Sequence, residues 1–86
     1  MVQDTSGLNA MLEIVEDQLV QNYPREVGLT LDRLRDEGYS RDKAVQLIGC
    51  ALSIEMMEMM KHDQKFNERR YWMNLERLPK LPWEFP

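Results

Sequence analysis

The chain has 86 residues, 43% of them hydrophobic, which is enough for one small domain and too little for two independent cores. Fifteen acidic and eleven basic side chains give a net charge of −4, which argues against a protein that coats phosphate backbones. Cys50 is the only cysteine, which excludes an internal disulfide and fits a reducing compartment. No apolar run reaches the roughly 18 residues of a membrane-spanning helix, and the first residues lack a secretory-signal pattern. We therefore expect a single cytoplasmic domain over 1–86 that does not contact membranes.

Two helices are expected in the first part of the chain. The first covers 8–21, where apolar residues recur at spacings of three and four and so form one buried stripe. These residues are Leu8, Met11, Leu12, Val15 and Leu19. The second helix covers 24–37 and starts at Pro24, because a missing N–H costs nothing in the first turn of a helix. Gly28 inside this helix is unfavourable relative to alanine, which predicts that another helix approaches closely at that residue.

A turn at Gly38 and Ser40 leads into a long central helix. The glycine closes the preceding helix in a left-handed conformation, and the serine hydroxyl caps the next one. The long helix is expected over 41–61, a shorter one over 67–78, and an extended, proline-rich tail over 79–86. The expected fold is all-α: an antiparallel bundle of three main helices plus a short fourth, because short connections make neighbouring helices antiparallel.

Methionines and aromatic residues supply the predicted interaction surface. Four methionines within five residues cover more than one face of the long helix, so at least one is expected outside the core of a monomer. The expected interface residues are Met56, Met57, Met59, Met60, Trp72, Trp83 and Phe85. The tail aromatics have two alternatives: they pack on their own bundle or on a neighbouring subunit. This surface predicts a non-enzymatic interaction or self-assembly module, most simply a homodimer. A different protein is the alternative partner.

One group of side chains has the spacing of metal ligands. Glu55, Glu58 and His62 stack along one side of the long helix at offsets of three and four. Carboxylate and histidine metal sites draw ligands from several helices, however, and this chain has a single histidine. We therefore expect no metal and no other cofactor. Metal binding remains an alternative function, with Glu13 or Glu16 completing the site.

Glu55 also lies on a row of apolar residues that is expected to face the core. A buried carboxylate needs a partner, and the candidates are Arg33, Arg69 and Arg70. An ion pair within or between subunits is expected there rather than a catalytic acid.

No catalytic residue is predicted, and we expect that the protein is not an enzyme. Cys50 has no histidine nearby in sequence and no helix N-terminus to activate it, so a small buried side chain is expected rather than a nucleophile. Arg41 and Lys43 would begin the recognition helix of a helix-turn-helix nucleic-acid binder, which is a second alternative. The apolar residues and glutamates that follow argue against it.

Two resemblances to known families are carried by specific residues. The first spans 24–82 and rests on these positions: Pro24, Arg33, Leu34, Gly38, Ala44, Ile48, Glu55, Phe66, Arg70, Tyr71, Leu75, Leu78 and Pro79. This stretch resembles a small all-helical domain family of bacterial proteins whose function is uncharacterised, so the resemblance brings no activity with it. The second, over 38–45, resembles the first loop and following helix of ubiquitin-associated domains and implies ubiquitin binding. Glu37 departs from that pattern, because the loop of those domains usually offers an apolar residue there.

Overall fold

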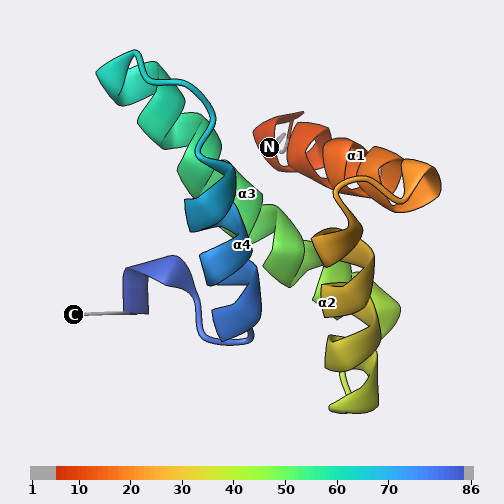
Figure 1. The fold of residues 1–86 in the computed structure, drawn as a ribbon. Coiled ribbons are helices and arrows are strands. Elements are labelled where there is room, and N and C mark those ends of the chain that lie inside the picture. The colour runs from red at the N-terminus through yellow and green to blue at the C-terminus, as the bar shows by residue number, and fades with distance from the viewer. Residues whose placement is uncertain (1–5, 85–86) are drawn as a thin grey trace, which may run out of the picture.

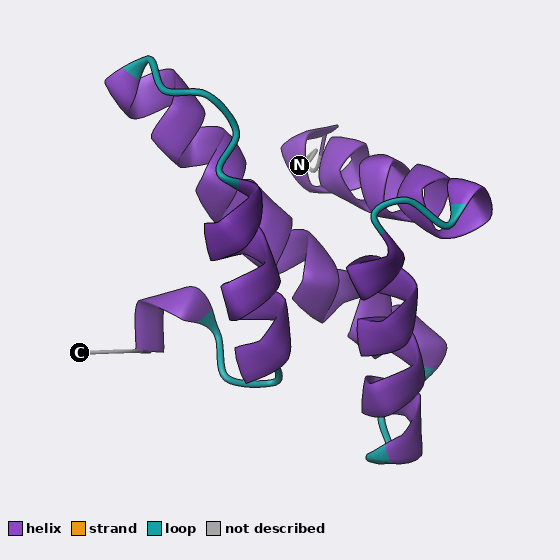
Figure 2. Cartoon of the chain, viewed as in Figure 1, coloured by secondary structure: helices purple, strands orange, loops and turns teal. Residues whose placement is uncertain are grey.

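The computed structural model describes residues 6–84, and every regular element among them is helical (Figure 1, Figure 2). The elements are α1 (Ser6–Gln21), α2 (Arg25–Asp36), α3 (Arg41–His62), α4 (Glu68–Arg77) and the 3-10 helix η1 (Pro82–Glu84). The predicted all-α class is confirmed, and the four α-helices begin and end within two residues of their expected bounds. Within residues 6–84, no helix has the length and apolar character needed to cross a membrane.

Side chains and backbone conformations fix the helix ends. The Ser40 hydroxyl accepts a hydrogen bond from the Lys43 backbone N–H at 3.1 Å at the start of α3. At the start of α4 the Asn67 side chain accepts one from the Arg70 backbone N–H at 3.0 Å. Gly38 has a φ of +102°, a conformation that side-chain-bearing residues rarely adopt. The turn predicted between α2 and α3 is therefore confirmed, with the serine as the cap.

The third helix, α3, is the central element. It contacts α1, α2, α4 and η1. Its buried apolar residues meet those of the other helices in one core, which includes Val15 of α1, Val27 and Leu34 of α2, and Tyr71 and Leu75 of α4. In Figure 1 the chain reverses its direction between α2 and α3 and again between α3 and α4, while α1 lies across the start of α2. The shorter helices thus bury their apolar faces largely against α3.

The tail is helical in part, although an extended chain was expected over 79–86. The element η1 covers Pro82–Glu84. The Glu84 carboxylate accepts a hydrogen bond from the Leu81 backbone N–H at 2.7 Å, and the Glu84 N–H donates to the Leu81 carbonyl at 2.9 Å. Leu81 packs against the core, and η1 contacts α3. Because a proline in a first helical turn loses no hydrogen bond, Pro82 starts a short helix here instead of prolonging an extended segment.

The close approach between helices lies at Gly49 and not at Gly28, where it was expected. A β-carbon at Gly28 would meet the nearby Asn22 side chain, with Oδ1 at 3.6 Å. A β-carbon at Gly49 would lie 3.4 Å from the Leu12 side chain, and Gly49 itself is buried. The Leu12 side chain of α1 therefore lies directly over Gly49 of α3, at a distance at which a β-carbon would just reach van der Waals contact.

Candidate functional site

A groove lined largely by methionines lies between α1 and α3. Its volume is about 410 Å³, and we call it the methionine groove. The residues that line it are Met11, Gly49, Cys50, Ser53, Met56, Met57 and Met60. Met11 comes from α1 and the others from α3, so the groove depends on the close contact of these two helices at Gly49. Methionine side chains are unbranched and flexible, which lets such a surface adapt to the shape of a partner.

Two methionines of the groove project into solvent. Met57 is 60% exposed and Met60 is 87% exposed, whereas Met56 is partly buried against the core. Met59, also predicted for the interface, is half-buried and does not line the groove. Three of the four methionines predicted as an interface therefore gather at one apolar groove.

The aromatic residues predicted for the interface lie apart from the methionine groove. Trp72 of α4 is packed against the core, and Trp83 of η1 is 59% exposed. Neither tryptophan lines the methionine groove. Phe85 lies outside the described residues.

Cys50 is a half-buried residue of the methionine groove, where a small buried side chain was expected. Burial raises the pKa of the thiol, and the charge of Lys43 opposes that effect only in part. The thiol is therefore protonated at neutral pH. Because the thiolate is the reactive form, this environment does not make Cys50 a nucleophile.

The buried carboxylate of Glu55 is paired with Arg70. Glu55 is fully buried, and its Oε2 accepts a hydrogen bond from Arg70 Nε at 2.7 Å. This hydrogen bond raises the pKa of the Arg70 guanidinium. Within the described residues the second oxygen, Oε1, has no hydrogen-bond partner. Of the three arginines proposed as partners, Arg70 is the one that binds, and the pair joins α4 to α3.

The three candidate metal ligands are not brought together. Glu58 and His62 form a pair on α3, with His62 Nε2 at 3.3 Å from Glu58 Oε2. Glu55 is instead buried and bound to Arg70. Within residues 6–84, no group of three histidine, cysteine, aspartate or glutamate side chains is placed to hold a metal ion. What the structure shows is therefore one pair, Glu58 and His62, along the surface of α3.

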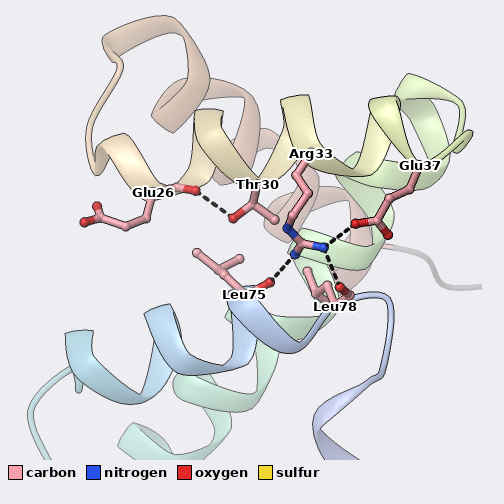
Figure 3. A network of polar contacts seen from close by, with 6 residues as sticks. All are labelled: Glu26, Thr30, Arg33, Glu37, Leu75 and Leu78. Atoms are coloured by element: carbon pink, nitrogen blue, oxygen red, sulfur yellow. Dashed lines mark hydrogen bonds and ion pairs between the residues drawn. The ribbon is translucent and has the colours of Figure 1, made fainter.

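Arg33, another proposed partner of Glu55, binds the end of α4 instead (Figure 3). Its Nη2 donates to the Leu75 carbonyl and its Nη1 to the Leu78 carbonyl, each at 2.9 Å. Glu37 holds the guanidinium from the other side, with Oε2 at 2.8 Å from Nη1. The Leu75 carbonyl also accepts a hydrogen bond from the Leu78 backbone N–H at 3.2 Å, so Arg33 of α2 adds to the hydrogen bonding at the C-terminal end of α4.

Arg41, which would begin a DNA-recognition helix, is bound within the fold. Its Nη1 and Nη2 donate to the two carboxylate oxygens of Glu16, both at 2.8 Å. These hydrogen bonds lower the pKa of Glu16 and raise that of Arg41. Glu13 and Asp17 lie beside the pair on the surface of α1. The guanidinium that would meet a phosphate is therefore bound by one carboxylate and lies near two others.

A second pocket, which the sequence analysis missed, is lined by aromatic rings. Its volume is about 320 Å³, and we call it the aromatic pocket. The residues that line it are Gln18, Tyr23, Pro24, Phe66, Glu68, Tyr71 and Trp72. The rings of Phe66 and Tyr71 meet edge to face, with centroids 5.6 Å apart and 70° between their planes. The four aromatic residues of the pocket come from two loops and from α4. The signal in the sequence was therefore no more than two aromatic residues in polar turns, Tyr23 and Phe66.

Comparison with known proteins gives no relative for this fold. No family model matches the chain, and no curated protein or solved structure matches it significantly.

Proposed function

We propose that the chain is a non-enzymatic self-assembly module of the cytoplasm that forms a homodimer through the methionine groove. The observation that carries this proposal is the pair of exposed methionines, Met57 and Met60, at the edge of an apolar groove of about 410 Å³. Large apolar side chains on a small domain lose contact with water when a partner covers them, which stabilises the complex.

A second copy of the chain is the partner that fits this surface best. None of the residues that line the groove carries a formal charge at neutral pH, so the groove favours a surface as apolar as itself. In a twofold dimer the same patch faces itself, so each subunit provides both a projecting Met60 and a groove that receives one. The flexible methionine side chain can adjust to such a fit.

The aromatic tail supports a second contact in the same dimer. Trp83 is 59% exposed, and η1 lies against α3, the helix that carries the methionines. A tryptophan that is buried only on assembly is a typical anchor of a protein interface. We therefore propose that Trp83, together with Phe85, makes a second contact between the subunits, separate from the methionine groove.

The experiment is sedimentation equilibrium of the full chain at micromolar concentration. We compare wild type with a Met57→Gln, Met60→Gln variant and with Met73→Gln as the matched control, since Met73 is 41% exposed on α4 and does not line the groove. The dimer dissociation constant is expected to rise by at least about tenfold in the double variant, because each subunit loses two buried side chains. The control is expected to leave it unchanged. A monomeric wild type, or equal constants in all three proteins, would refute the proposal.

The resemblance to uncharacterised bacterial helical domains is consistent with a structural role. Several of its residues make framework contacts: Arg33 binds the end of α4, Glu55 pairs with Arg70, and Tyr71 and Leu75 are buried in the core. We propose that these residues mark a shared antiparallel helical framework. The exposed methionines then belong to this chain's own assembly surface.

A further inference from the structure

The aromatic pocket is separate from the methionine groove, and the two share no lining residue. Among the lining residues, Tyr23 has 71% of its surface exposed, whereas Tyr71 is fully buried. Phe66 and Trp72 are partly buried. The pocket therefore combines an accessible ring with rings fixed by the core.

The polar groups of the inner rings are not available to a ligand. The Tyr71 hydroxyl donates a hydrogen bond to Gln18 Oε1 at 3.0 Å, and burial raises the pKa of this hydroxyl far above its usual range. The indole Nε1 of Trp72 is buried, without a hydrogen-bond partner in the described part of the chain. Trp72 therefore offers an occupant ring carbon, with the negative charge of the π system on the ring face, while the fully buried Tyr71 supports Phe66 through their edge-to-face contact.

The charge of the pocket has one sign. Glu68, at the first turn of α4, is exposed and is the one formally charged residue among the described residues that line it. Lys65 and Arg69 are neighbours in the sequence but do not line the pocket. A carboxylate beside several aromatic rings favours a positive charge over a neutral or negative one.

We propose that the aromatic pocket binds an organic cation of the trimethylammonium class. Such a cation is attracted by ring faces within about 6 Å, and it is the ligand for which aromatic enclosures are best suited. A lysine ammonium is a compact, strongly hydrated charge that needs a hydrogen-bond acceptor for each of its three N–H groups, and four of the seven residues that line this pocket present aromatic rings. A trimethylated nitrogen needs no hydrogen bond and buries methyl groups against the rings. The binding step is noncovalent, with the exposed ring of Tyr23 beside the cation and Glu68 balancing its charge.

The test measures the tryptophan fluorescence of the full chain in a Trp83→Phe background, so that Trp72 is the reporter. Choline is titrated against 3,3-dimethylbutanol, which has the same shape without the charge. Choline is expected to change the emission and saturate with a dissociation constant of roughly millimolar order, at least about tenfold below that of the neutral alcohol. Equal binding of the two compounds, or no saturation by choline, would overturn the proposal.

Two variants examine the source of the affinity. Tyr23→Leu keeps an apolar side chain and removes the ring, and Glu68→Gln removes the charge; each is expected to weaken choline binding by about three- to fivefold. Glu13→Gln is the matched control, because Glu13 is an exposed carboxylate that does not line the pocket. Since Tyr23 and Glu68 are both exposed, the melting temperature is expected to stay unchanged. Choline affinity that is the same in all three variants would contradict the assignment.

A further arm separates the two sources of a trimethylammonium group. A short peptide with trimethyllysine is compared with choline and with the same peptide carrying unmodified lysine. Tighter binding of the trimethylated peptide assigns the pocket to a modified protein, and tighter binding of choline assigns it to a small molecule. The Met57→Gln, Met60→Gln variant is expected to bind choline like wild type, so the outcome is independent of the proposed dimer.

Discussion

Replacing Arg70 by methionine removes the side chain that binds the buried carboxylate of Glu55. The carboxylate is fully buried and accepts its hydrogen bond at 2.7 Å, so the change leaves a negative charge without a partner inside the fold. Breaking such a pair costs about 3–5 kcal/mol. The Arg70 side chain is 35% exposed, so water can partly replace it, and we expect the lower end of this range. A loss of about 3 kcal/mol corresponds to a decrease of roughly 15 °C in melting temperature for a domain of this size.

The matching variant isolates the charge from the packing. Glu55→Met leaves a guanidinium that can reach water and is expected to cost about 1 kcal/mol. The Glu55→Met, Arg70→Met variant removes both charges and is expected to lie within about 1 kcal/mol of wild type. Urea unfolding followed by circular dichroism measures all four proteins at one fixed concentration, because self-association contributes to apparent stability. The reasoning would be refuted if Arg70→Met lowered the free energy of unfolding by less than about 1 kcal/mol. It would also be refuted if the loss in the double variant equalled the sum of the losses in the two single variants.

Three further predictions follow from contacts elsewhere in the fold. Arg33→Met loses two hydrogen bonds to the end of α4 and is expected to lower unfolding free energy by about 2 kcal/mol; an equal loss in the exposed control Arg35→Met would contradict this. Gly38→Ala forces a side chain into a φ of +102° and is expected to cost at least about 1 kcal/mol, so an unchanged melting temperature would rule out that strain. The pKa of Glu16 is lowered, chiefly by its hydrogen bond to Arg41, from its ordinary value of 4.5. The stabilisation by this pair is therefore present above that value and is lost as the pH falls through the lower pKa of the folded state. In the Glu16→Gln variant, the free energy of unfolding is expected to lose this acid-dependent contribution. If the variant and wild type gave identical profiles of unfolding free energy against pH, the pair would not be the cause.

The helices were predictable because local signals agreed with the apolar spacing. The glycine and serine at 38 and 40 specify a turn by backbone conformation and capping, and the structure has both features there. The tail was harder, because a proline-rich composition is compatible with an extended chain and with a first helical turn. Packing of Leu81 on the core accompanies the second alternative, and the sequence does not display that contact.

For the contacts between helices, the sequence offered several possible partners for one residue and could not choose among them. Three arginines were suitable partners for Glu55, and crossing geometry decides that Arg70 binds it while Arg33 binds carbonyls of α4. The same geometry places the close approach at Gly49 rather than Gly28. Methionine clustering on one helix was visible in the sequence, but the contribution of Met11 from α1 was not. A groove or pocket with walls from distant segments requires the tertiary fold.

The two proposed sites are connected by α1, which contributes a wall to each. Met11 lines the methionine groove, and Gln18, which holds the Tyr71 hydroxyl, lines the aromatic pocket. The helix is fixed between them by the contact of Leu12 with Gly49 and by the buried Val15. Both sites are therefore built on one position of α1, which the core already holds in the free chain. Because neither partner has to move α1, the two binding events are expected to be independent: a ligand that does not change a conformational equilibrium transmits no coupling free energy to a second site.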